Sequence, residues 1–165
     1  MNATDHTHLV RAVDLAETGL ELGHDPFGSV LVSADGDVLF EDHNRIGSGD
    51  STRHPEFAIA QWAAANLTPE QRAKATVYTS GEHCPMCAAA HGWVGLGRIV
   101  YASSSEQFGQ WLGEFGAGPQ SVRRLAITDV LVNPDADGPD LTLADRIREL
   151  HARRAKDGGY GLTKD

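Results

Sequence analysis

The residues of this sequence that point most directly to chemistry are His54, Cys84 and Cys87. Zinc favours imidazole and thiolate ligands in a tetrahedral shell, and a catalytic site gives it three protein ligands and leaves the fourth place for water. Only Pro-Met separates the two cysteines, at the start of a predicted helix, so both sulfurs can face one point while the helix N-terminus favours the thiolate form. We therefore expect these three side chains to hold a zinc ion (Zn2+).

Glu56 is the acid that such a site would use. It lies two residues after His54 at the start of another predicted helix, where it can reach a water on the metal without being a ligand itself. A carboxylate in that position can accept a proton from the water and deliver protons to a leaving group. The alternatives are a closed structural zinc site with His83 or His91 as fourth ligand, or no metal at all, and neither gives Glu56 a role.

Apolar periodicity predicts the elements that must position these side chains. In chain order they are a helix over 7–22, strands over 28–33 and 38–43, a helix over 55–66, a strand over 76–80, a helix over 85–94, a strand over 98–102 and a helix over 142–156. The Asp-Gly pair within 34–37 predicts a tight hairpin turn. The strand, helix and strand over 76–102 predict a crossover with parallel pairing.

The remaining segments carry weaker patterns. Residues 103–118 are rich in glycine and aromatic residues without a clear period, which predicts a loop with at most one short helix. Two apolar stretches, 122–127 and 130–132, are candidates for short regular elements. The last residues, 158–165, are expected to form a flexible tail or a segment that covers the active site.

Length and composition predict one domain over residues 1–165, with 41% hydrophobic content. No run approaches the ~18 apolar residues of a membrane span, and the N-terminus has no signal-peptide pattern, so a cytoplasmic protein without a membrane partner is expected. The only two cysteines then suit metal binding better than a disulfide. A net charge of −9 argues against nucleic-acid binding, because that affinity depends on Lys and Arg neutralising phosphates.

Two short motifs carry a family resemblance, His54-Pro55-Glu56 and His83-Cys84-Pro85-Met86-Cys87. They resemble the H-x-E and P-C-x-x-C signature of zinc-dependent deaminases. From about Pro26 to Tyr101 the chain resembles the cytidine and deoxycytidylate deaminase zinc-binding superfamily, in its guanine deaminase and tRNA adenosine deaminase branch. The resemblance implies an α/β fold, a three-layer α/β/α sandwich with a mixed five-stranded sheet. His83 departs from the family, which usually has proline before the first cysteine.

The same resemblance implies a hydrolase that replaces the exocyclic amino group of a small heterocycle by oxygen and releases ammonia. Guanine, cytosine-like bases and amino-triazines all carry such an amine on a flat ring, and the acidic composition favours a free base over a folded RNA. Deamination of tRNA adenosine and a non-catalytic zinc-stabilised binding module are the alternatives. Related enzymes are commonly dimers, so a homodimer is also implied.

By this resemblance Phe27, Asn44 and Trp93 match substrate-binding positions. The two aromatic rings would sandwich the heterocycle, and the Asn44 amide would read its polar edge as both donor and acceptor. Core packing of the aromatic residues and a turn cap by Asn44 are the alternative interpretations.

Guanine-type enzymes also carry a second acid after the fourth strand. Glu114 is the nearest match, with Glu106 as the alternative. Trp111 or Phe115 would line the same pocket, and Tyr160 in the tail would close it from the same chain or from a partner chain.

Overall fold

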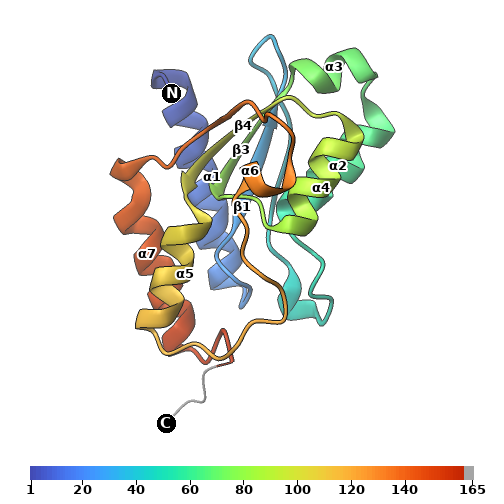
Figure 1. The fold of residues 1–165 in the computed structure, drawn as a ribbon. Coiled ribbons are helices and arrows are strands. Elements are labelled where there is room, and N and C mark those ends of the chain that lie inside the picture. Colours follow the sequence, from blue (N-terminus) through green and yellow to red (C-terminus); the bar gives the residue numbers. More distant parts are fainter. Residues whose placement is uncertain (162–165) are drawn as a thin grey trace.

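The computed structural model describes residues 1–161, which form a sheet between two layers of helices (Figure 1). The helices are α1 (Ala3–Glu21), η1 (Ile46–Ser48, a 3-10 helix), α2 (Pro55–Asn66), α3 (Pro69–Lys74), α4 (Pro85–Val94), α5 (Ser105–Glu114), α6 (Ile127–Val130) and α7 (Leu141–Lys156). The strands are β1 (Gly28–Val32), β2 (Val38–His43), β3 (Thr76–Gly81), β4 (Arg98–Ser103) and β5 (Ala136–Asp137).

The sheet is mixed and has the strand order β2-β1-β3-β4-β5. β1 pairs antiparallel with both β2 and β3, whereas β4 pairs parallel with β3 and β5. The β1–β2 connection turns at Gly36, whose φ of +93° glycine adopts without strain. α4 makes the crossover from β3 to β4, so the predicted hairpin, the parallel unit and the mixed five-stranded sheet are confirmed.

Helices cover both faces of this sheet. α1, α5 and α7 lie on one side, and α2 and α4 lie on the other (Figure 1). The three-layer α/β/α sandwich is therefore confirmed. None of the helices in residues 1–161 combines the length and the apolarity that crossing a membrane requires.

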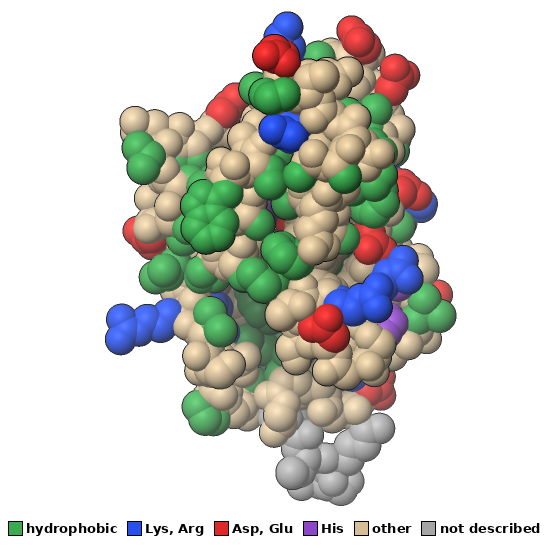
Figure 2. Space-filling model, turned by 90° about the vertical axis from the view of Figure 1, so that its right-hand side faces the viewer, with side chains coloured by type: hydrophobic (Ala, Val, Ile, Leu, Met, Phe, Trp, Pro, Cys, Tyr) green, Lys and Arg blue, Asp and Glu red, His purple; other side chains and the backbone are tan. Residues whose placement is uncertain are grey.

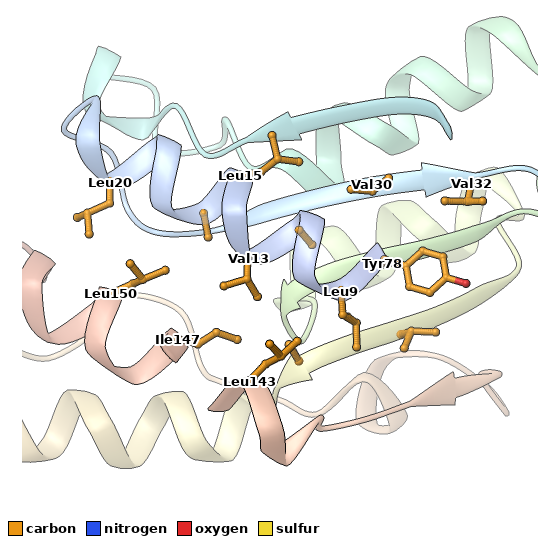
Figure 3. Packing of buried hydrophobic residues seen from close by; sticks show 14 of the residues in the cluster. Leu9, Val13, Leu15, Leu20, Val30, Val32, Tyr78, Leu143, Ile147 and Leu150 are labelled. Carbon is orange, nitrogen blue, oxygen red and sulfur yellow. The ribbon is translucent and has the colours of Figure 1, made fainter. Parts of the chain in front are cut away.

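The larger core lies between the sheet and the helices α1 and α7. Leu9 of α1, Val30 of β1 and Ile147 of α7 are fully buried there, and their side chains converge from three elements (Figure 3). Successive side chains of a strand point to opposite faces, so Leu31 belongs instead to a second core with Ile59 of α2. The two cores fix α2 against one face of β1 and α1 against the other.

The chain departs from the sequence expectation mainly after β4. α5 is a ten-residue helix in the segment for which the composition predicts a loop with at most one short helix. The regular element within 122–132 is α6, and β5 follows outside both apolar stretches. β5 has two residues and is defined by its pairing with Ile99 and Val100, so it leaves no periodic pattern of its own. α3 is a further short helix that the pattern does not predict.

Candidate active site

Two helix N-termini bring the predicted zinc ligands together. His54 is the residue that caps α2 and Cys84 is the residue that caps α4, and each helix begins with a proline. Proline suits this position because its fixed φ is helical and the N–H that it lacks would have no partner there. Cys87 lies one turn into α4, so its sulfur faces the same point as the sulfur of Cys84.

The three donor atoms have the spacing of a tetrahedral zinc site. The two sulfurs are 3.5 Å apart, and each lies 3.6 Å from Nδ1 of His54. Zinc–sulfur bonds of about 2.3 Å and zinc–nitrogen bonds of about 2.0 Å at tetrahedral angles require sulfur–sulfur and sulfur–nitrogen separations of about 3.8 and about 3.5 Å. Within residues 1–161 no other group of His, Cys, Asp or Glu side chains comes together in this way. The donor set therefore fits zinc.

The two thiols share one negative charge. A hydrogen bond from the Cys87 thiol, opposed by burial and assisted by His54, lowers the pKa of Cys84 to about 4. The same hydrogen bond, together with burial, raises the pKa of Cys87 well above its ordinary range. A thiolate at the N-terminus of α4 is also stabilised by the helix dipole. The pair thus presents a soft anionic donor to a metal ion.

Glu56 lies beside these donors and is only 5% exposed. Its Oε1 accepts a hydrogen bond of 2.8 Å from the Thr79 hydroxyl, which accepts one of 2.9 Å from the Ser29 hydroxyl. Its Oε2 lies 3.8 Å from the sulfur of Cys87. Burial raises the pKa of Glu56, because a low-dielectric environment disfavours the charged carboxylate. Thr79 and Ser29 therefore set the direction in which this acid points.

A cavity of about 320 Å³ opens beside the ligands and Glu56. Its wall includes His54, Glu56 and Cys84, together with Phe27 and Asn44. A volume of this order lies at the lower end of the range for small-molecule sites, about 300–1,000 Å³. A metal site, an acid and room for a small molecule thus meet at one place.

Residues 2–103 match the family described as "Cytidine and deoxycytidylate deaminase zinc-binding region". The chain belongs to this family. The matched segment contains both motifs that the sequence offered, and the family binds zinc, which agrees with the donor geometry of His54, Cys84 and Cys87.

Relatives of this chain differ in the substrate that their names state. The chain is 32% identical to a probable cytosine deaminase of Schizosaccharomyces pombe over 64% of each chain. It is 38% identical to the guanine deaminase of Bacillus subtilis, over 59% of this chain and 63% of that one. It is 33% identical to a tRNA-specific adenosine deaminase of Agrobacterium fabrum, over 64% of this chain and 70% of that one. The match thus spans less than two thirds of the length of the first two proteins.

The solved structure of the guanine deaminase from Nitrosomonas europaea shares the fold. It aligns with a TM-score of 0.65 over 90% of this chain and 82% of that one, at 18% sequence identity. At that identity the likeness shows the fold alone. It reaches beyond residue 103, where the family match ends, and so includes the C-terminal part of the chain.

Phe27 and Asn44, for which the resemblance implies substrate binding, both lie in the cavity wall. Phe27 meets Phe108 edge-on, with 5.4 Å between the ring centroids. Asn44 is 1% exposed, and its Oδ1 accepts a hydrogen bond of 3.0 Å from the N–H of Ile46. Asn44 therefore caps the turn at η1 and also faces the cavity, so the two interpretations of this residue are compatible.

Tyr160 reaches the cavity from the C-terminal tail of the same chain. Its hydroxyl lies 2.6 Å from Nδ1 of His151, which is fully buried in α7. Burial lowers the pKa of His151 to about 3, so the imidazole is neutral. The tail is thus fixed over the cavity as far as residue 161, and the predicted tail residues 162–165 lie outside the described part of the chain.

Trp93 and Glu114 lie outside the cavity wall of their own chain, so within one chain the structure does not bring them to the predicted site. Trp93 is 89% exposed and is not part of the cavity wall. It follows Cys87 by six residues on α4, and this helical spacing turns its side chain about 120° away from the ligand. Glu114 ends α5 at the surface, where it accepts a hydrogen bond of 2.7 Å from Arg148. Neither side chain can touch a molecule in the cavity of its own chain.

The other sequence candidates also lie outside the cavity wall. Trp111 belongs to the larger core and Phe115 packs against that core. Glu106 lines a separate surface pocket near the start of α5. His83 is buried against His91, with 5.3 Å between the ring centroids, and neither joins the three metal-binding side chains. The structure therefore gives no support to a closed zinc site with a histidine as fourth ligand.

Several residues of the cavity wall are not predicted by the motifs. Asp25, Phe108 and the consecutive residues Arg123 and Arg124 all line the cavity. The helical spacing of Phe108 with Trp111 and Leu112 is a signal that could have placed Phe108 on the inner face of a helix. The two arginines lie in an irregular loop, where no sequence pattern indicates what they face.

Proposed function

We propose that this protein is a zinc-dependent hydrolytic deaminase that replaces the exocyclic amino group of a small nucleobase-like heterocycle by oxygen and releases ammonia. Guanine, or a cytosine or amino-triazine analogue, is the substrate class that we favour. The position of Glu56 carries the proposal, because a buried carboxylate lies in the wall of a small cavity beside three donor atoms at zinc spacing. A purely structural zinc site has no use for such an acid.

Each residue of the site has a separate role in this proposal. His54, Cys84 and Cys87 would hold the zinc ion, which when bound supplies a nucleophilic water at neutral pH. Glu56 accepts the proton that this water releases and delivers protons to the ring nitrogen and to the departing amine. Thr79 keeps Oε1 of Glu56 hydrogen-bonded, so Oε2 is the oxygen left to exchange protons.

Phe27, Asn44 and Tyr160 form the rest of the proposed substrate site. The Phe27 ring offers a flat apolar surface for a heterocycle. Because the Asn44 carbonyl oxygen already accepts a hydrogen bond from the backbone, its NH2 group is the part available to donate to the substrate. Tyr160 covers the same space from the tail. Trp93 and Glu114 are not part of this cavity wall, and we assign them no role in the site of a single chain.

Two other functions are weaker candidates. A tRNA adenosine deaminase would admit a flipped-out base to the same cavity. The net charge of −9 disfavours it, because RNA binding depends on basic surface. A non-catalytic zinc-stabilised binding module would explain the metal ligands, but it leaves the buried Glu56 without a role.

A homodimer, a single domain over residues 1–165 and a cytoplasmic location stay predictions. Trp93 and Val132, at 89% and 92% exposed, are hydrophobic side chains that a second copy could cover. Figure 2 looks onto the side of the molecule that carries α2 and α4, and hydrophobic side chains gather on it. Light scattering coupled to size-exclusion chromatography tests the dimer.

An ammonia-release screen with zinc counted in parallel tests the proposed function. The compounds are guanine, cytosine, 5-azacytosine, amino-triazines, cytidine and adenosine, with an adenosine-containing tRNA hairpin as a further arm. We expect release from at least one free base, at about one zinc per chain, and loss of release after chelation. Release from the hairpin alone would favour the tRNA enzyme. Zinc-dependent folding without any release would favour the binding module.

A further inference from the structure

Most arginine side chains of this protein are neutralised by carboxylates. The arginines that form ion pairs are Arg11, Arg45, Arg98, Arg146, Arg148, Arg153 and Arg154. Such pairing is expected in a chain with 23 acidic and 14 basic side chains. An arginine without an acidic neighbour is therefore informative.

Arg123 and Arg124 are two such arginines, and both lie in the wall of the cavity that contains Glu56. In the described residues, 1–161, neither forms an ion pair with an Asp or Glu side chain. The Arg124 guanidinium lies 6.0 Å from the centre of the Phe108 ring, which belongs to the same wall. Both arginines are exposed, and Arg124 also lines the neighbouring surface pocket, so two adjacent positive charges border the space in which a substrate would lie.

The acids of the cavity wall are already engaged. Asp25 accepts a hydrogen bond of 2.7 Å from Arg154. The two carboxylate oxygens of Glu82 accept hydrogen bonds of 2.7 Å from the first backbone N–H groups of α5 and α6. Glu56 is the acid of the zinc site. None of these carboxylates neutralises the two arginines.

The loop that carries the arginines, residues 115–126, is anchored where it meets α6, through the N–H of Ile127. α5 precedes this loop and α6 follows it, and Glu82 binds the first N–H group of each helix. Glu82 itself lies two residues before the zinc ligand Cys84. Glu82 therefore links the arginine loop to the turn that carries Cys84. Because Cys84 and Glu56 belong to the same site, this link helps to fix the two positive charges relative to Glu56.

We propose that the substrate carries an anionic group, a phosphate or a carboxylate, attached to its amino-heterocycle, and that Arg123 and Arg124 bind this group. The inference rests on the proposed function, and it narrows the substrate class. The amine end of the molecule lies beside Glu56, and its anionic end lies at the arginine loop. Guanidinium groups bind phosphate and carboxylate through paired N–H donors. Two arginines are too few to hold a folded RNA, which requires many phosphate contacts.

The test compares pairs of compounds that differ chiefly in the anionic group, on zinc-loaded protein. Cytidine against its 5′-monophosphate and guanosine against its 5′-monophosphate test a phosphate, and cytosine against cytosine-5-carboxylate tests a carboxylate. The measurements are kcat/KM for ammonia release and the Kd of each compound by titration calorimetry. We expect the anionic member of at least one pair to be preferred by about tenfold or more.

The double substitution R123Q/R124Q should remove this preference, because it lowers kcat/KM for the anionic member of a pair far more than for the neutral member. R148Q is the matched control, because it removes the same charged group from the surface outside the cavity. It should retain the preference. Equal kcat/KM and equal Kd within every pair would overturn the proposal, as would a preference that survives the double substitution. Tighter binding of an RNA hairpin than of any small anion would overturn it too.

The two proposals fail in different ways. If neutral bases release ammonia and no anionic compound is preferred, the anion site is wrong and the deaminase proposal stands. If anionic compounds bind through Arg123 and Arg124 but nothing releases ammonia, the anion site stands and the deaminase proposal is wrong.

Discussion

Asp5 and Glu56 are both buried carboxylates, at 2% and 5% exposure, but their surroundings differ. The two carboxylates lie on opposite faces of the sheet, and each accepts a hydrogen bond from one of two consecutive residues of β3. The Tyr78 hydroxyl donates to Asp5 at 2.9 Å on the α1 side, and the Thr79 hydroxyl donates to Glu56 at 2.8 Å on the α2 side. One strand therefore supports two acids, because successive side chains point to opposite faces.

The two acids differ in how their charge is compensated. The guanidinium of Arg98 donates to both oxygens of Asp5, and this hydrogen bonding is the main cause that lowers the pKa of Asp5 to about 2. In residues 1–161 Glu56 forms no ion pair with a lysine or arginine, and burial raises its pKa. A fully compensated carboxylate holds its charge and stabilises the fold. A partly compensated carboxylate in a cavity can exchange a proton.

The largest expected effect is on catalysis, from Glu56→Gln. The amide keeps the shape of the side chain and can still accept the hydrogen bond from Thr79, but it cannot carry a proton between water and amine. We expect ammonia release to fall by about a thousandfold or more while zinc content and Tm are retained. Turnover within about tenfold of the wild type would mean that Glu56 is not the proton carrier.

The next effect is on stability, from Asp5→Asn. This change leaves Arg98 with only Asp137 as an acidic partner, in a site where Asp5 is the more deeply buried acid. Removing one partner of a buried ion pair costs about 3 kcal/mol, which urea unfolding can measure. The kcat of the folded fraction should not change. If Asp5→Asn lost activity and kept its stability, Asp5 would not be a purely stabilising acid, and its role would not differ from that of Glu56.

The stabilising effect of Asp5 should also depend on pH. Its pKa falls from the ordinary 3.8 to about 2 in the folded protein, so the unfolded chain binds the proton more tightly than the folded chain. The resulting stability is present above about pH 4 and is lost as the pH falls towards 2, and it amounts to about 2 kcal/mol. The difference in unfolding free energy between wild type and Asp5→Asn should narrow over this window. A constant difference would contradict the assigned pKa.

The zinc site could be predicted from sequence because its signals are local. His54 and Cys84 each precede a proline that begins a helix, and the spacing of Glu56 and Cys87 within the first turns follows directly. These four side chains come together once the N-termini of α2 and α4 lie next to each other. The strands were predictable for a similar reason, since the short run over 28–32 is buried on both faces of the sheet and an Asp-Gly turn follows it within a few residues.

The rest of the site depends on contacts that no local pattern contains. α5 begins with a capping box formed by Ser104 and Gln107, but Gly109 and Gly113 interrupt its helical pattern. The side to which Trp93 turns is set by how α4 packs, and the partner of Glu114 comes from a helix far along the chain. A match of positions along the sequence cannot decide these orientations.

A smaller effect is expected from Thr79→Val, which tests how Glu56 is oriented. Valine keeps the shape of threonine but cannot donate to Oε1 of Glu56, and it leaves the Ser29 hydroxyl without its acceptor. We expect kcat to fall about tenfold with little change in KM, at a stability cost of about 1 kcal/mol. Thr79→Ser retains the hydroxyl and should restore kcat. If Thr79→Ser and Thr79→Val were equally slow, the hydroxyl would not be the group that matters.

The smallest effects are expected from Trp93→Ser and Glu114→Gln, the two positions that the structure moves out of the site. Because Trp93 is 89% exposed and Glu114 binds Arg148 at the surface, kcat and KM should each stay within about twofold of the wild type. The kcat and KM of both variants and of the wild type should be measured at several protein concentrations, over which the fraction of dimer changes. A rise in KM for Trp93→Ser that appears only where the wild type is a dimer would place this ring in the cavity of a second copy. In that case dimer formation would explain why Trp93 is exposed in a single chain. The metal site would then be complete within one chain, whereas the substrate site would need residues from two chains.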